Sequence, residues 1–536
     1  MDDHYTAEEL REIQTKLGTH PFDPFVSMAE SSRNTFEMLS DALEKEVPQD
    51  ALIEIYGKDN RQRRLIESKA ADILAQALTG KLAWDAEGCA WFLWFGTHWA
   101  PQANGSKAES LVALGVHIGC GTLGYRPTYL SGVINLIQRR RLLRLPIFPQ
   151  GLIPFANGVF EIKAKRLVKA TPERSLDWCL PHRYDKTADC TTIRAWLLRN
   201  VEGDHETVEM LRAWLAALLR GIPLQKFLVL IGRGGTGKGT FQRLCLALVG
   251  ECNTAISALR DLEENRFETA KLYGKRLCMI NEAGRHGGSI NMLKAITGGD
   301  HVPLERKHVQ QAGSFVFAGL VLMASNEDLM TTDSTSGLER RRLTVRFPVT
   351  ATTEEKADWD ERGGEPAVLH AEIPGLINWC LQLSVQDIRA RIENPPARVL
   401  QDNLMGMAAG NSVADWMLEC TTPDPDAWGQ IGHRAGDGKP YFEHEHDWLY
   451  ANYLAYCQRE GRRNPVSNRK FATTIIDMGE TLGHRFIKAS HPVGRYRAIR
   501  GLRLREDSDP PRAFESSAGN IAPENAPSDD FDEAVF

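Results

Sequence analysis

A glycine-rich loop with a lysine is the part of this sequence with the clearest chemistry. Residues 232–240 read Gly-Arg-Gly-Gly-Thr-Gly-Lys-Gly-Thr. Glycines let successive backbone N–H groups converge on phosphate oxygens, and the N-terminus of a following helix adds partial positive charge. Lys238 adds a full charge that reaches the β- and γ-phosphates of a nucleotide. The predicted phosphate-binding residues are Gly232, Gly234, Gly235, Thr236, Gly237, Lys238, Gly239 and Thr240.

Apolar runs on both sides of this loop predict the elements that hold it. Phe227–Ile231 is a short, continuous apolar run, which is typical of a strand buried on both faces. Phe241–Val249 has apolar residues at helical spacing. Strand, glycine-rich turn and helix are the context that a nucleotide-binding loop requires. The alternative is a glycine-rich turn that closes an ordinary βα unit, but it does not account for the position of Lys238.

The residue after Lys238 departs from the usual phosphate-binding pattern. That pattern places Ser or Thr directly after the lysine, where the hydroxyl binds magnesium. Gly239 has no side chain for this role, so Thr240 is the candidate that contacts a phosphate or holds the metal through water. Small-molecule kinases that resemble adenylate kinase also carry Gly-Lys-Gly-Thr. The loop alone therefore does not separate a kinase from a motor ATPase.

Two further apolar runs end in polar residues that would complete a hydrolytic site. Leu277–Ile280 is followed by Asn281 and Glu282, and Leu320–Ser325 is followed by Asn326. We expect Glu282 to be a metal ligand and the general base for attack on the γ-phosphate, and the alternative is a surface carboxylate at a strand end. Asn281 stands where many related enzymes carry a metal-binding Asp, which predicts weaker direct coordination of magnesium. Asn326 is expected to orient the attacking water, although Asn is also common in turns at strand ends.

Arginines follow this set of residues at short distance. Lys238, Glu282 and Asn326 are spaced 44 residues apart, and Arg340 and Arg341 come soon afterwards. Arginines placed after such a core can reach the nucleotide of a neighbouring subunit and stabilise charge in the transition state. The alternative for these arginines is a solvated strand flank.

Five segments, in this order, resemble the motifs of superfamily 3 helicases. The likeness is strongest to the primase–helicases of phages, plasmids and poxviruses. It extends over roughly residues 84–505, through a helicase-associated region that includes 151–226 and a lid segment at 372–379. The order of the motifs is specific, although no single motif is. The five segments are Gly232–Phe241, Leu277–Glu282, Leu293–Asp300, Leu322–Asn326 and Gly337–Phe347.

The resemblance implies a ring, expected to be a hexamer, with ATP and Mg²⁺ between subunits and single-stranded DNA in a central channel. On that analogy Arg340 or Arg341 is the arginine finger presented to the neighbouring subunit. Residues 301–308 resemble the channel hairpin of the family, in which Lys and Arg neutralise phosphates without reading sequence. A basic solvated turn is the alternative. The predicted DNA-binding residues of this segment are Arg306, Lys307 and His308.

The region 447–505 is strongly basic, with twelve Lys/Arg and four Asp/Glu. Leu449–Arg459 has helical spacing, Ser467 is a candidate cap for a second helix at Asn468–Met478, and two basic strands follow. Helix, helix and hairpin predict a winged helix-turn-helix that binds duplex DNA, a module with which the resembling family commonly ends. A basic packing domain inside the ring is the alternative. The predicted DNA-binding residues are Arg469, Lys470, Arg495 and Arg497.

The last stretch of the chain, 506–536, is acidic and has few large apolar residues, which predicts a disordered tail. It ends in Asp-Asp-Phe-Asp-Glu-Ala-Val-Phe, which is similar to the C-terminal peptides of bacterial single-stranded-DNA-binding proteins. Three roles remain open. The tail recruits host replication proteins, it competes with DNA for the basic region, or it is an inert solubilising segment.

The composition excludes several classes of protein. The chain of 536 residues is 42% hydrophobic and 25% charged with a net charge of −6, and its mean hydropathy is −0.33. Its longest apolar run, Phe315–Ala324, is far shorter than the ~20 residues that span a bilayer. No basic-then-apolar export signal begins the sequence, so we expect the cytoplasm of a bacterial host. Ten cysteines lie singly, as reduced core thiols do, without zinc-binding spacing.

Together these observations predict an α/β fold: a P-loop NTPase core of the AAA+-like, superfamily 3 type, with helical N-terminal regions and a C-terminal winged helix. We expect polar helices at 6–17 and 61–78, short strands in 84–99, and helices at 130–145 and 206–219. The expected domains are a helical region at 1–80, a helicase-associated domain at 81–205, the ATPase core and lid at 206–400, the winged-helix region at 401–505, and the tail at 506–536.

The leading functional hypothesis is an ATP-dependent DNA helicase of a phage or mobile genetic element that acts as a ring-shaped motor in replication. A second hypothesis is an origin-binding initiator or loader that uses ATP only to assemble, which the departures at Gly239 and Asn281 favour. A third is a P-loop small-molecule kinase, for which the sequence has no recognisable monophosphate lid. Strand displacement on a forked duplex distinguishes the first two hypotheses.

Overall fold

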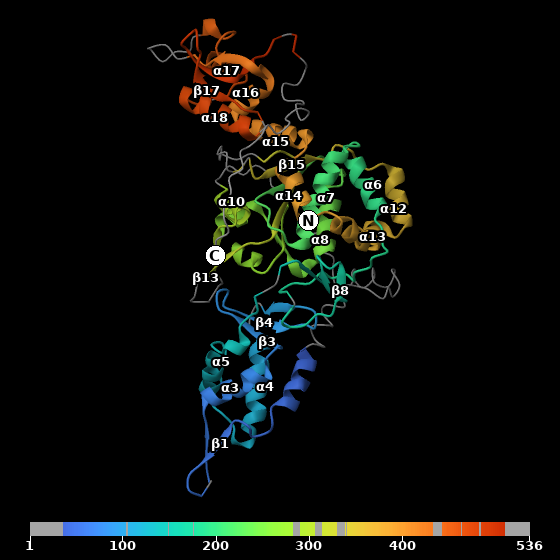
Figure 1. The fold of residues 1–536 in the computed structure, drawn as a ribbon, viewed down its shortest axis with the longest axis vertical. Helices are drawn as coiled ribbons and strands as arrows, with labels where there is room; N and C mark the ends of the chain where they lie inside the picture. The colour runs from blue at the N-terminus through green and yellow to red at the C-terminus, as the bar shows by residue number, and fades with distance from the viewer. Residues whose placement is uncertain are drawn as a thin grey trace. The chain divides into compact units, whose positions relative to one another are not determined.

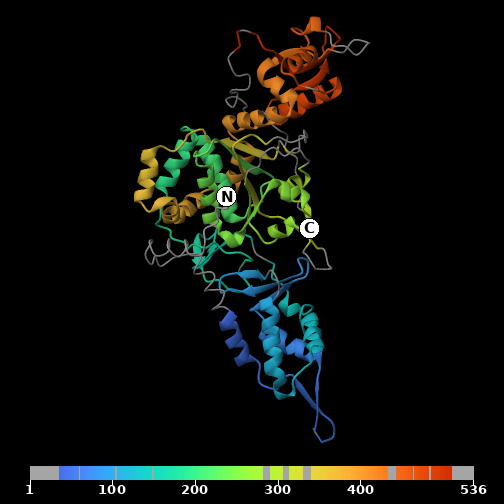
Figure 2. The same ribbon diagram turned by 180° about the vertical axis from the view of Figure 1, so that it is seen from behind.

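The computed structural model divides into two compact units, shown in Figures 1 and 2. Unit 1 comprises 1–327 and 346–394, and unit 2 comprises 328–345 and 395–536. The structure describes residues 36–509 except 60, 103–105, 148–149, 175, 282–289, 306–312, 330–337, 339, 433–441, 463, 482–483 and 507. The expected helix at 6–17 and nearly all of the acidic tail therefore lie outside the described residues.

Unit 1 begins with a small helical subdomain built on a three-stranded antiparallel sheet. The sheet order is β3-β4-β5, and alternate residues of β4 face opposite sides. Trp91 and Leu93 pack into the core of the helices, whereas Phe92 packs into a second, smaller apolar cluster. The elements are a helix over 36–46, α3 (Glu67–Ala77), α4 (Ser106–Cys120), α5 (Pro127–Ile137), β3 (Leu82–Asp85), β4 (Ala90–Trp94) and β5 (Trp99–Gln102).

Two sequence predictions in this subdomain need correction. The expected helix over 61–78 is only partly helical, because Gln62–Leu65 forms strand β2 and pairs with β1 (Ile53–Tyr56) as an antiparallel hairpin. Three polar and charged residues in a row, Gln62, Arg63 and Arg64, make this strand unrecognisable by pattern analysis. The expected helix over 130–145 ends at Ile137 and is followed by a 3-10 turn at Arg141–Leu143. The short strands expected within 84–99 are present as β3, β4 and the start of β5.

The central sheet of unit 1 contains four parallel strands in the order β10-β11-β14-β9. The side chains of β9 and β14 are buried along their whole length, as expected for strands covered on both faces. Helix α8 contacts β11 and β14, and α7 packs on α8. The elements are β9 (Phe227–Ile231), β10 (Thr254–Ser257), β11 (Leu277–Asn281), β14 (Leu320–Ser325), α7 (His205–Arg220) and α8 (Lys238–Val249). A smaller antiparallel sheet, β6 (Leu152–Phe155), β7 (Gly158–Glu161) and β8 (Arg166–Val168), precedes them.

Helix α13 (Gly364–Leu381), which contains the expected lid segment, is fastened to the start of α6 (Thr191–Asn200). The carboxylate of Glu372 accepts the backbone N–H groups of Thr192 and Ile193 at 3.0 and 2.8 Å, so it caps α6 from a distant part of the chain. The helices approach closely at Gly375, where an added Cβ would lie 2.0 Å from the backbone carbon of Asp189. A glycine at this position lets α13 lie directly against the chain that enters α6.

Unit 2 contains a helical cluster packed on a three-stranded antiparallel sheet of order β16-β18-β17. Its core is aromatic, with Trp416, Tyr453 and Phe471 in mutual contact. The elements are α15 (Ala397–Gly410), α16 (Ser412–Cys420), β16 (Thr421–Gln430), α17 (Leu449–Arg459), α18 (Asn468–Thr481), β17 (Ile487–Ser490) and β18 (Arg497–Leu504). The expected helix, helix and hairpin are therefore present, and α16 and β16 are additions that the sequence analysis did not predict.

Candidate nucleotide and nucleic-acid sites

The glycine-rich loop connects β9 to the first residue of α8, as the sequence predicts. Gly235 and Gly237 have φ angles of +78° and +91°, a region that favours glycine over any other residue. A Cβ on Gly237 would also lie 2.8 Å from Nδ2 of Asn200. At Gly237 both the backbone conformation and the lack of space for a side chain therefore require glycine. The loop forms a tight curve at the N-terminus of a twelve-residue helix.

Lys238 folds back over this curve. Its Nζ donates to the carbonyl oxygens of Gly232 and Arg233 at 2.6 and 2.8 Å, and the residue is only 9% exposed. Burial lowers the pKa of the Lys238 ammonium group. An ammonium group has three donors, so two hold the loop and a third remains for an anionic oxygen. The geometry therefore fits a phosphate group in the loop.

Asn200 is a buried residue beside the loop that sequence analysis missed, because no local motif marks it. It is 0% exposed, and its Oδ1 accepts from Nη2 of Arg199 at 2.8 Å. Among the described residues its Nδ2 has no hydrogen-bond partner. An unsatisfied buried donor costs about 1–3 kcal/mol, so the site beside Gly237 fits an additional acceptor.

The side chains of Glu365 and Arg243 surround Thr240 and Gly239, the two residues after Lys238. Oγ1 of Thr240 donates to Oε2 of Glu365 at 2.8 Å, and Nη2 of Arg243 donates to the same oxygen at 2.8 Å. A Cβ on Gly239 would lie 3.1 Å from Nη1 of Arg243, so the guanidinium occupies the space beside this glycine. Glu365 lies in the first turn of α13, so α13 contacts the start of α8 through these three side chains.

The polar residues at the strand ends lie at one edge of the sheet, as expected for parallel strands. Ser325 of β14 pairs with Ile231 of β9, and Asn326 follows it as an exposed residue next to the start of the loop. Asn281 ends the next strand, β11, where its Oδ1 accepts from Nε2 of Gln242 on α8 at 2.8 Å. Glu282, the predicted general base, lies outside the described residues.

The predicted arginine fingers lie on the turn that leads into β15 (Arg342–Arg346). Arg340 and Arg341 belong to unit 2, and the glycine-rich loop belongs to unit 1. Arg340 is exposed and Arg341 is half-buried, and the backbone N–H of Arg341 donates to the carbonyl of Leu338 at 3.0 Å. Their role at a neighbouring subunit stays a prediction.

The expected channel hairpin has two paired strands. β12 (His301–Leu304) and β13 (Gly313–Val316) form an antiparallel pair in which Leu304 opposes Gly313. The predicted DNA-binding residues Arg306, Lys307 and His308 lie between these strands and outside the described residues. Exposed residues on β12 and β13 show that this pair has a solvent-facing side.

In unit 2 the predicted DNA-binding residues lie on α18 and on the β17–β18 hairpin. Arg469 and Lys470 are exposed in the first turn of α18, and the backbone N–H of Lys470 donates to Oγ of Ser467 at 3.4 Å, consistent with the expected cap. Arg495 has a φ angle of +53° in the hairpin turn, and Arg497 is exposed at the start of β18. All four side chains are thus available on the surface of unit 2.

The described residues show few other candidate centres. Among them, no group of three or more His, Cys, Asp or Glu side chains could hold a metal ion, and each helix is too short or too polar to cross a membrane. All ten cysteines are free thiols, and most are buried. Burial raises the pKa of the Cys179, Cys190 and Cys278 thiols to about 12, so these behave as inert core residues.

Two families match parts of the chain. Residues 128–201 match the family described as D5 N terminal like, and residues 230–342 match a family of unknown function, DUF5906. The first match covers most of α5, the β6–β8 sheet and α6, and the second begins in β9 and includes the glycine-rich loop. The D5 match supports the coarser resemblance to phage-type primase–helicases upstream of the loop.

Individual proteins show weaker similarity. An uncharacterized mitochondrial protein, ymf20, of Marchantia polymorpha is 26% identical over 121 residues, which cover 22% of this chain and 71% of that protein. Two apo structures of the NrS-1 C-terminal region align with TM-scores of 0.44 and 0.43 at 12% identity. They cover 80% and 81% of this chain and 98% and 99% of their own. These similarities assign no role to individual residues.

Proposed function

We propose that this chain is an ATP-dependent DNA helicase of a phage or mobile genetic element, and that it works as a ring in replication. The observation that carries the proposal is the loop between β9 and α8, with Lys238 inside its curve and Asn326 directly after the adjacent strand. The D5 N-terminal-like match supports a place in phage-type DNA replication. Superfamily 3 membership, the winged-helix assignment of unit 2 and the hexamer are parts of this proposal.

The proposal assigns specific tasks to residues of this chain. Lys238 and the loop amides bind the phosphates, and Asn326 orients water. Glu282 accepts a proton from the attacking water. ATP, when bound with Mg²⁺, supplies the γ-phosphoryl group whose hydrolysis releases the free energy for movement. The proposed metal ligands, Thr240 and Glu282, offer the hard oxygen donors that Mg²⁺ prefers. Arg340 or Arg341 stabilises charge at the site of a neighbouring subunit.

Glu365 is expected to position the loop end for nucleotide binding. Replacing it with alanine should weaken Mg–ATP binding by about tenfold, because the Thr240 hydroxyl and the Arg243 guanidinium lose the charged partner that orients them beside the loop. Calorimetric titration with a non-hydrolysable ATP analogue measures the change. Glu365→Gln should recover part of the affinity, since its amide oxygen still accepts from Thr240, and exposed Glu361→Ala is the control. Unchanged affinity in Glu365→Ala would contradict this role.

The initiator or loader remains the second candidate. The guanidinium of Arg243 beside Gly239, and Asn281 where an Asp is usual, both favour weaker metal coordination and slower turnover. A small-molecule kinase is less well supported, since it leaves the exposed basic residues of unit 2 without a function.

Strand displacement on a forked DNA duplex tests the proposal. We expect the wild-type protein to release the displaced strand only with hydrolysable ATP, and to hydrolyse ATP at least fivefold faster with single-stranded DNA. Size-exclusion chromatography with light scattering should show assembly in the presence of nucleotide and DNA. ATP-dependent assembly without strand displacement would favour the initiator. Phosphoryl transfer to a small acceptor without stimulation by DNA would favour the kinase.

A further inference from the structure

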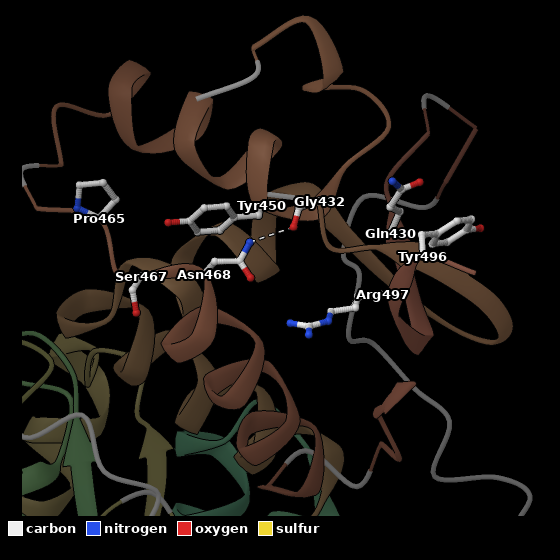
Figure 3. Close-up of a pocket in the computed structure, with 8 residues that line it drawn as sticks. All are labelled: Gln430, Gly432, Tyr450, Pro465, Ser467, Asn468, Tyr496 and Arg497. Atoms are coloured by element: carbon white, nitrogen blue, oxygen red, sulfur yellow. Dashed lines mark hydrogen bonds between the residues drawn. The ribbon is translucent and has the colours of Figure 1, made fainter. Parts of the chain in front are cut away.

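Unit 2 contains a pocket of about 750 Å³ between the first turn of α18, the start of α17 and the β17–β18 hairpin, shown in Figure 3. This volume is within the range of about 300–1,000 Å³ that small ligands occupy. The lining residues are Gln430, Gly432, Tyr450, Pro465, Ser467, Asn468, Tyr496 and Arg497. None of them is acidic, and one is a cation, so the pocket suits a ligand with negative charge.

Two polar side chains of the pocket have unused hydrogen-bonding capacity. Nδ2 of Asn468 donates to the carbonyl of Gly432 at 3.0 Å, which leaves its Oδ1 as an acceptor. Arg497 is exposed and, among the described residues, its guanidinium forms no hydrogen bond or ion pair. Figure 3 shows this side chain reaching from β18 toward the first turn of α18. An exposed arginine whose N–H groups are not used within the protein can bind a phosphate through several of them.

Two tyrosine residues, Tyr450 and Tyr496, are also among those that line the pocket. One face of the Tyr496 ring stacks on His491, with centroids 4.7 Å apart and planes 15° from parallel. His491 in turn contacts Trp428 with a centroid distance of 5.2 Å. Tyr450 is fully buried, and its hydroxyl donates to the carbonyl of Val466 at 2.9 Å, so its ring is fixed. Tyr496 is therefore a supported ring of the kind on which nucleic-acid bases stack.

We propose that this pocket binds one unpaired nucleotide of single-stranded DNA, with its base against Tyr496 and its phosphate at Arg497. The exposed cations Arg469, Lys470 and Arg495 nearby in unit 2 supply attraction for the rest of the strand. The inference rests on the proposed DNA binding by unit 2 and is independent of ATP hydrolysis. It differs from duplex binding because an unpaired base is needed to reach the ring.

Fluorescence anisotropy with the full chain, in the absence of ATP, tests the pocket. The probes are a labelled 20-nucleotide single strand and the matching duplex. Tyr496→Ala should weaken single-strand binding by about tenfold and change duplex binding by less than twofold, because only the stacking partner is lost. Tyr496→Phe keeps the ring and should bind as the wild type does. Arg497→Ala should weaken single-strand binding. It should also make the slope of log K against log[salt] shallower by the amount expected for about one phosphate contact.

Lys488→Ala is the matched control, since Lys488 is an exposed cation of β17 outside the pocket. A strand that contains 2-aminopurine should be quenched by the wild type and Tyr496→Phe but not by Tyr496→Ala. Equal loss of single-strand and duplex binding in Tyr496→Ala, or no loss in either, would overturn the proposal. Free dAMP is added at the same concentration of nucleotide units as the labelled single strand. Displacement of the strand by dAMP would show a mononucleotide site instead and would also overturn the proposal. A protein that binds neither DNA would refute DNA binding by unit 2 as a whole.

Discussion

Replacing Lys238 with alanine is expected to reduce ATP turnover by about a hundredfold or more. The Lys238 ammonium group lies inside the curve of the phosphate-binding loop and is also bonded to two of the loop's carbonyl oxygens. The substitution therefore removes the charge that binds phosphate and loosens the loop that presents the backbone N–H groups. A coupled phosphate-release assay measures turnover, and titration with a fluorescent nucleotide should show weaker binding.

The control for this experiment is Lys163→Ala, which removes an exposed lysine of unit 1 from the turn that joins β7 to β8. Turnover in that variant should match the wild type. Circular dichroism and the thermal midpoint of Lys238→Ala should show that the fold survives. Full turnover by Lys238→Ala would mean that nucleotide is hydrolysed elsewhere on the chain, and the helicase proposal would fail with it.

Glu282→Gln is expected to have the second large effect, a loss of about 10²–10⁴-fold in turnover with little change in nucleotide affinity. Glutamine has nearly the same size as glutamate but does not accept a proton. In this variant turnover should therefore fall while nucleotide affinity stays nearly unchanged, whereas both should decrease in Lys238→Ala. Single-turnover hydrolysis and equilibrium titration on the same preparation give the two quantities.

Glu251→Gln, an exposed carboxylate in the turn after α8, is the control and should hydrolyse ATP normally. Unwinding of the forked duplex should disappear in Glu282→Gln together with turnover. Normal hydrolysis by Glu282→Gln would remove this residue from the catalytic role. The general base would then be sought among the remaining carboxylates of unit 1, beginning with Glu365, which already bonds to Thr240.

Local sequence patterns predicted the parts of the fold that local physics determines. The strand at Phe227–Ile231 and the helix at Leu449–Arg459 are present with those bounds, and the helix expected over Phe241–Val249 begins three residues earlier, at Lys238. In each case a continuous apolar run or a clear helical period coincides with the element, and the neighbouring glycines or polar residues end it. The adjacency of Asn326 to the loop also follows, because parallel strands bring their carboxyl ends to one edge.

Contacts between distant residues were not predictable in this way. Glu365 lies 125 residues after Thr240, and no sequence pattern in either segment predicts the hydrogen bond between them. Asn200 lies at the end of an ordinary helix, and only the close approach of Gly237 makes it part of the site. Strand β16 was missed because Pro423 and Pro425 interrupt it; it tolerates them with an irregular register between Asp424 and Trp428.

The fastening of α6 has a mechanical consequence. The Glu372 carboxylate accepts hydrogen bonds from the first turn of this ten-residue helix. Its last residue, Asn200, lies so close to Gly237 that a Cβ on that glycine would be 2.8 Å from its Nδ2. A helix is stiff along its axis, so α6 links the glycine-rich loop to α13. If the proposed nucleotide binding changes the shape of the loop, α6 and α13 should move together with it.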